Sequence, residues 1–170
     1  MKVPFILSNL GNWSKGRGGK AITRGYFHRT AVKGDTALGE ANYFHNHCVK
    51  ASFYKVIDLA GNIVQSVAPA DTSWAVNLWV ENQISLSYEF TGLNDSPLTP
   101  AQIKAAISDI KADPATKKIA STRLTISQIK AGKASGWANH KDVTLAYLIA
   151  GGHSDAISET EIAQILAGLR

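Results

Sequence analysis

The segment from residue 84 to residue 90 limits the fold of this chain more than any other. Its apolar side chains alternate with polar ones and are Ile84, Leu86, Tyr88 and Phe90. A period of two is typical of a β-strand that places one face against a core. The chain therefore needs a sheet with a second layer over it, and Glu89 is predicted on the face opposite the core-facing side chains.

A helix with clear ends is expected after this strand. Thr99, Pro100 and Gln102 match a capping box with proline at the first helical position. Apolar residues then recur at helical spacing, at Ile103, Ala106, Ile107 and Ile110. The Asp113-Pro114 pair ends this pattern, so a helix is predicted to about residue 112.

Shorter elements are expected elsewhere in the chain. They are a loop at 11–20, a strand at 22–28, a helix from Asp35 or Thr36 to about His47 with Leu38, Ala41 and Phe44 or His45 on one side, a hairpin of 53–58 and 63–67, a helix at 125–131 that ends at Gly132, and a last helix that opens at 158–161.

We predict a single α/β (α+β) domain over residues 1–170, with its core at about 20–170. A central, mostly mixed β-sheet would be flanked by helices.

Composition agrees with one globular domain. The chain has 170 residues, of which 45% are hydrophobic and 18% charged, and it has one cysteine, Cys48, which excludes an internal disulfide. The apolar run at 3–7 is too short for a signal peptide, and no run approaches the roughly 20 residues of a membrane span. We expect synthesis in the cytoplasm without an export signal and no stable membrane association.

The net charge of +5 favours contact with polyanions, such as nucleic acid, anionic lipid or the polymers of a bacterial wall. Charge alone does not choose among them. The sequence lacks an arginine-rich helix and a ladder of aromatic residues, so nucleic-acid binding is not predicted.

Histidines near the ends of predicted strands are the candidates for chemistry. His28 and His140 each follow an apolar or β-prone stretch where the chain turns into a polar loop, and a glycine-hinged loop carries His153 and Asp155. A catalytic zinc needs three protein ligands and one open position. His28, His140 and either His153 or Asp155 meet that requirement, although lone histidines are more often hydrogen-bonded near a surface. His45 and His47, two residues apart on a helix, cannot face one another.

Several segments, in order from about residue 20 to 165, resemble the zinc-dependent N-acetylmuramoyl-L-alanine amidases, the group that includes peptidoglycan recognition proteins and amidase-type phage lysozymes. The matching segments are 26–31, 52–63, Gln65 with Val67 and Trp74-Ala75, 82–92, 99–102, 136–143 and 152–155. Three positions depart from the family pattern. Ala75 replaces the histidine of a Trp-His pair, Tyr54 replaces the hairpin histidine, and Ala156 replaces a proline.

The resemblance implies one Zn²⁺ per chain in a cleft at the strand ends, with His28, His140 and Asp155 as ligands. It makes Glu89 the general base, with Tyr54 next in line for that role. His153 would stabilise the oxyanion. The implied substrate contacts are Tyr54, Trp74 and Thr30.

The implied activity is hydrolysis of the amide bond between N-acetylmuramic acid and the L-alanine of the stem peptide, which lyses the bacterial wall. A phage endolysin or prophage autolysin is the expected setting, with antimicrobial action on peptidoglycan after release from the host cytoplasm through a partner pore. We expect a monomer without a separate cell-wall-binding domain. The alternative is a module of the same fold that binds peptidoglycan without cutting it.

Overall fold

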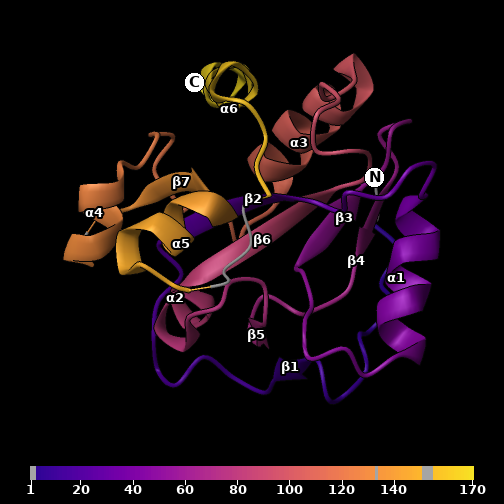
Figure 1. Ribbon diagram of the computed structural model, residues 1–170, viewed down its shortest axis with the longest axis horizontal. Helices are drawn as coiled ribbons and strands as arrows, with labels where there is room; N and C mark the ends of the chain where they lie inside the picture. Colours follow the sequence, from indigo (N-terminus) through magenta and orange to yellow (C-terminus); the bar gives the residue numbers. More distant parts are fainter. Residues whose placement is uncertain (1–2, 133, 151–154) are drawn as a thin grey trace.

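A five-stranded sheet lies at the centre of the computed structural model, which describes residues 3–132, 134–150 and 155–170 (Figure 1). Its strands, in spatial order, are β4 (Ile63–Gln65), β3 (Lys55–Ile57), β6 (Ser85–Phe90), β2 (Arg24–Arg29) and β7 (Gly136–Asn139). Neighbouring strands from β3 to β7 run parallel, and β4 is antiparallel to β3. The predicted mixed sheet flanked by helices is confirmed.

The remaining elements surround this sheet. The helices are α1 (Ala37–Asn46), α2 (Trp79–Ile84), α3 (Pro100–Ala112), α4 (Ile126–Ala131), α5 (His140–Tyr147) and α6 (Glu159–Gly168), and a second sheet pairs β1 (Trp13–Ser14) with β5 (Thr72–Ser73). The predicted capping box of α3 forms at Thr99, α6 begins as predicted and has a capping box at Ser158, and α4 ends at Gly132 in the left-handed conformation. Among the described residues, no helix is long and apolar enough to cross a membrane.

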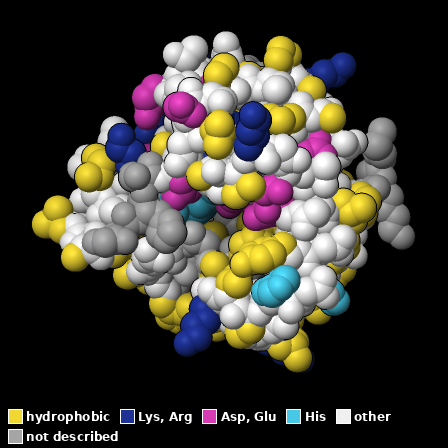
Figure 2. Space-filling model, turned by 45° about the vertical axis from the view of Figure 1, so that its right-hand side comes forward, with side chains coloured by type: hydrophobic (Ala, Val, Ile, Leu, Met, Phe, Trp, Pro, Cys, Tyr) yellow, Lys and Arg dark blue, Asp and Glu magenta, His cyan; other side chains and the backbone are white. Residues whose placement is uncertain are grey.

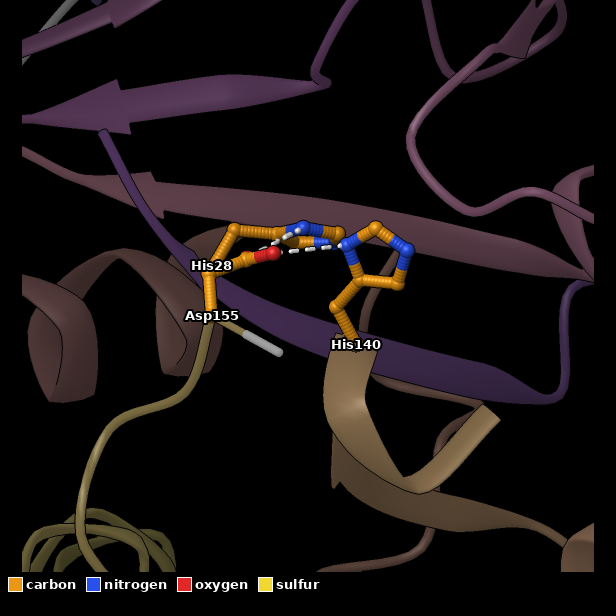
Figure 3. Close-up of side chains that lie close together, drawn as sticks. All are labelled: His28, His140 and Asp155. Carbon is orange, nitrogen blue, oxygen red and sulfur yellow. Dashed lines mark ion pairs between the residues drawn. The ribbon is translucent and has the colours of Figure 1, made fainter. Parts of the chain in front are cut away.

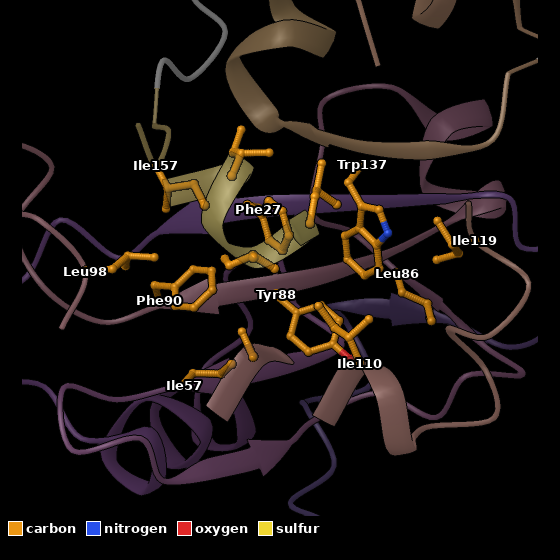
Figure 4. Packing of buried hydrophobic residues seen from close by; sticks show 14 of the residues in the cluster. Phe27, Ile57, Leu86, Tyr88, Phe90, Leu98, Ile110, Ile119, Trp137 and Ile157 are labelled. Atoms are coloured by element: carbon orange, nitrogen blue, oxygen red, sulfur yellow. The ribbon is translucent and has the colours of Figure 1, made fainter. Parts of the chain in front are cut away.

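Helices α3 and α6 cover one face of the sheet. The apolar side chains of β6 pack there against Phe27 and Trp137, whose rings stack with centroids 5.0 Å apart (Figure 4). Leu86, Tyr88 and Phe90 are fully buried in this cluster. The period-two pattern therefore identified the side of β6 that carries the larger core.

The other face is covered by helices at its two sides. Helices α4 and α5 pack over β2 and β7 through a cluster that includes Tyr26, Ile129 and Val143. Helix α1 packs over β3 and β4 through Ala37 and Ala41. This arrangement leaves the carboxyl ends of β2 and β6 between α1 and α5.

The fold buries the polar face of one strand and corrects two local expectations. The polar side of β6 is buried, because Ser87 is covered by Ser73 of β5, with their hydroxyl oxygens 3.3 Å apart. Leu38 is 55% exposed, since the small residues of α1 are the ones that dock on the sheet. Residue 140 begins helix α5 rather than a polar loop.

Candidate metal centre

The carboxyl ends of three parallel strands bring distant residues together. His28 is next to last on β2, and its register partner on β6 is Glu89. His140 directly follows β7, which lies on the other side of β2. Because parallel strands end at the same edge of a sheet, these side chains meet although they are far apart in sequence.

The turn after β7 also fixes the segment that carries Asp155. The Asn139 side chain donates a hydrogen bond to Ile157 O at 3.0 Å and accepts one from Ile157 N at 3.2 Å. Asp142 accepts a hydrogen bond from Asn139 N at 2.8 Å, which closes the start of α5. One buried asparagine thus holds the chain near both His140 and Asp155.

His28, His140 and Asp155 form a compact cluster (Figure 3). His28 Nδ1 lies 3.3 Å from Asp155 Oδ2, and His140 Nδ1 lies 3.0 Å from Asp155 Oδ1. The two imidazole rings are 4.8 Å apart between centroids. Both histidines are buried, and Asp155 is half-buried.

This donor set fits zinc. Tetrahedral ligands that lie about 2.0–2.1 Å from zinc are separated by about 3.3 Å, close to the nitrogen–oxygen separations here. Two imidazoles and one carboxylate leave a fourth position for water or substrate. Burial alone would raise the pKa of Asp155, but the hydrogen bonds from His140 and His28 outweigh it and hold that pKa well below the usual range. Asp155 is therefore ionised at neutral pH, as a metal ligand must be.

Glu89 stands beside this cluster in a setting that favours its protonated form. Burial, followed by the nearby charges of Asp155 and Glu40, raises its pKa well above the ordinary value, and Arg29 opposes that shift. Carboxyl groups whose pKa is raised by their surroundings serve as acids and bases at many active sites. Glu89 is thus suited to acid–base chemistry.

A cleft of about 270 Å³ opens over these residues. Figure 2 shows the hollow on this face, where histidine and acidic side chains lie next to apolar ones. Two predicted substrate contacts line the cleft, Thr30 and Trp74. The Thr30 hydroxyl accepts a hydrogen bond from Gly92 N at 3.3 Å, and the Trp74 indole donates one to Ser14 Oγ at 3.0 Å.

The third predicted contact, Tyr54, lies elsewhere. It is 2% exposed in the core beneath α3, with its ring edge-on to Tyr88 and its hydroxyl bonded to Asp113. This places it on the opposite face of the sheet from the cleft, so it is corrected from a substrate contact, or a reserve base, to a core residue. His153 lies outside the described residues.

Two charged residues of the cleft were missed by the sequence analysis. Glu40 comes from α1, and its pKa is raised to about 7 by burial and by the neighbouring Asp35. Lys50 comes from the loop between α1 and β3. Neither residue belongs to a motif, and only the packing of α1 against the sheet brings them to the site.

Comparison with known proteins identifies relatives of this architecture. The family model described as N-acetylmuramoyl-L-alanine amidase matches residues 18–159. No curated protein matches the sequence.

Solved structures share the fold. The Staphylococcus aureus hydrolase AmiA, in complex with its ligand, is similar with a TM-score of 0.76 and 16% identity over 99% of this chain and 83% of that one. The endolysin N-acetylmuramoyl-L-alanine amidase LysCS from Clostridium intestinale gives a TM-score of 0.61 and 14% identity over 98% and 95% of the two chains. PlyL gives 0.61 and 16% over 97% of both.

Proposed function

This chain belongs to the N-acetylmuramoyl-L-alanine amidase family, and from that membership we propose that it is a zinc-dependent peptidoglycan hydrolase. The bond cut would be the amide between N-acetylmuramic acid and the L-alanine of the stem peptide. One observation carries the proposal. His28, His140 and Asp155 converge to within 4.8 Å beside an open cleft, which is the ligand number of a hydrolytic zinc site.

The roles of the residues follow from their positions. His28, His140 and Asp155 would hold one Zn²⁺, which supplies a Lewis acid that polarises the amide carbonyl and activates water. Glu89, across the strand pair from His28, would accept a proton from the attacking water and deliver it to the leaving alanine nitrogen. His153 in its protonated form would stabilise the oxyanion.

Substrate would lie along the cleft beside Thr30 and Trp74. Trp74 offers a half-buried aromatic surface, and Thr30 lies near the end of β2, two residues after His28. A sugar and a peptide each present apolar faces beside polar hydroxyl or amide groups. The aromatic face of Trp74 and the hydroxyl of Thr30 therefore support binding of a sugar and a peptide on the two sides of the scissile bond.

The biological setting belongs to the same proposal. We propose a phage endolysin or prophage autolysin that acts as a monomer on the wall after its release from the host cytoplasm. Similarity in fold to an endolysin amidase supports this setting. The wall-lysis and antimicrobial roles follow from the same chemistry.

A cleavage assay on a defined muramyl peptide tests the activity. The expected result is release of a peptide with a new amino-terminal L-alanine, which stops with a chelator and returns on addition of zinc. His28→Ala should abolish both zinc binding and cleavage. A protein that binds peptidoglycan but releases no peptide with zinc present would support the alternative of a binding module.

A further inference from the structure

Lys50 lies on the wall of the cleft in a backbone conformation that lysine seldom adopts. Its φ is 57°, in the left-handed region where residues other than glycine are uncommon. It lines the same cleft as His28 and Glu89. Such conformations persist where the surrounding structure enforces them, and they gather at binding sites. We propose that Lys50 is a specificity-determining residue that binds a carboxylate of the stem peptide, an inference that rests on the proposed function.

The conformation of Lys50 is enforced by one buried side chain. Asn12 is fully buried, and its Oδ1 accepts hydrogen bonds from Val49 N at 2.8 Å and Lys50 N at 2.9 Å. Its Nδ2 donates to Phe44 O at 2.9 Å and His47 O at 2.7 Å. The side-chain amide of Asn12 thereby uses both of its N–H donors and both lone pairs of its oxygen.

The same loop is tied by hydrogen bonds to Trp74, which also lines the cleft. Ser52 Oγ donates to Asn12 O at 2.7 Å and accepts from Trp74 N at 3.0 Å. Ser52 N also donates to Trp74 O at 3.0 Å. The backbone at Lys50 is therefore held in place relative to Trp74, which positions the residue to bind substrate beside that ring.

The charged residues that line the cleft indicate what Lys50 can bind. The acidic residues that line it are Glu40, Glu89 and Asp155. Arg29 is 4% exposed, and its Nη2 donates to Leu93 O at 2.7 Å and to Ser96 O, while its Nη1 is buried without a hydrogen-bond partner among the described residues. Of the lysines and arginines that line the cleft within the described residues, Lys50 alone is exposed.

The chemistry of the ligand follows from the exposed positive charge of Lys50 in the cleft. A stem peptide carries carboxylates beyond its first alanine, and each is either free or converted to an amide. An ammonium group attracts the free carboxylate by charge but gains little from the neutral amide. Lys50 would therefore make the enzyme prefer peptides in which this carboxylate is free.

The experiment compares two synthetic N-acetylmuramoyl dipeptides that differ only in whether the α-carboxyl of the second residue is free or an amide. Lys50→Gln should raise KM for the free carboxylate by about fivefold, the upper range for an exposed ion pair, with kcat unchanged. KM for the amide should stay the same. Lys50→Arg should keep the preference of the parent. Lys117→Gln, which removes the same charge from an exposed turn outside the cleft, is the matched control.

Two further arms separate the possible failures. Lys50→Gly suits the left-handed conformation, so it tests loss of charge without backbone cost if the glutamine variant is unstable. If the parent cleaves neither dipeptide, the proposed function fails, and calorimetric binding of both dipeptides to parent and Lys50→Gln then decides the role of Lys50. A ratio of KM or Kd between the two dipeptides that is the same in Lys50→Gln and Lys117→Gln would overturn the proposal.

Discussion

At the scale of single residues, Asp155 is the group that contacts both histidines of the metal centre. Its two oxygens contact Nδ1 of His28 and Nδ1 of His140 at 3.3 and 3.0 Å. A carboxylate between two imidazoles holds both rings in place and lends negative charge to a cation bound there. The residue pattern left His153 and Asp155 as alternative third ligands, the family resemblance favoured Asp155, and the structure places Asp155 in the donor cluster.

We predict that Asp155→Ala loses zinc, whereas His153→Ala keeps zinc and loses turnover. The reason is that Asp155 belongs to the donor cluster, while His153 is proposed to act on the oxyanion. Zinc content per chain after dialysis measures the first effect, and peptide release measures the second. Zinc lost from His153→Ala but retained by Asp155→Ala would reverse the assignment.

A second residue-scale prediction concerns Glu89. Glu89→Gln should retain the fold and the zinc but lower kcat by about 10²–10⁴-fold, the usual contribution of a general base. The amide keeps the size of the side chain and cannot accept the proton. Zinc content and kcat are measured on the same preparation, and a variant within threefold of the parent would exclude Glu89 as the base.

At the scale of elements, the site depends on how β7, α5 and the segment before α6 are joined. Asn139 ends β7, precedes His140 on α5, and makes two hydrogen bonds with Ile157. Its loss would free the segment that carries Asp155 without removing any ligand. Geometry held by such supporting residues commonly determines metal affinity.

We predict that Asn139→Ala weakens zinc binding by about 10–100-fold, the typical effect of losing a group that orients ligands. Thr125→Ala is the control, because it removes the cap of α4 without contact with the donor cluster. The cap is worth about 1 kcal/mol of stability. Competition with a chromophoric chelator measures affinity, and equal affinities in the two variants would show that Asn139 has no such role.

At the scale of the whole molecule, a buried ion network joins the sheet to α3. Lys55 Nζ contacts Asp109 at 2.8 Å and Asp113 at 2.6 Å, with all three side chains at most 10% exposed. Burial would raise the pKa of Asp113, but hydrogen bonds from Lys55 and Tyr54 outweigh it and lower that pKa. The network lies on the opposite face of the sheet from the cleft, so it affects stability separately from catalysis.

The lowered pKa of Asp113 predicts an acid limit to stability. A carboxyl whose pKa is lower in the folded state stabilises the fold above its unfolded pKa of about 3.9, and this contribution is lost as the pH falls through the folded value. The free energy of unfolding should therefore fall more steeply below about pH 4 in the parent than in Asp113→Asn. Urea unfolding from pH 3 to 6 measures the difference, and parallel curves would contradict it.

The sequence alone determined the elements whose signals are local. The alternation in β6, the capping box of α3, residues 158–161 at the start of α6, and Gly132 at the end of α4 each specify backbone geometry through neighbouring residues. Elements without such signals were missed, namely β1, β5, α2 and α5, and β7 was indicated only as a β-prone stretch before His140, without bounds. β1 and β5 are two residues long, and β7 is buried at every position, so none of them offers a clear period.

Only the tertiary structure decided which residues share the cleft. The histidines and Asp155 were proposed from the sequence because their types suit a metal, but their contact depends on parallel pairing of β2 with β7 and on Asn139. Tyr54 stands at the motif position of the hairpin histidine and faces the core, while Glu40 and Lys50 belong to no motif and line the cleft. The physical reason is that residue type is fixed locally, whereas the face on which a side chain lies depends on how distant elements pack.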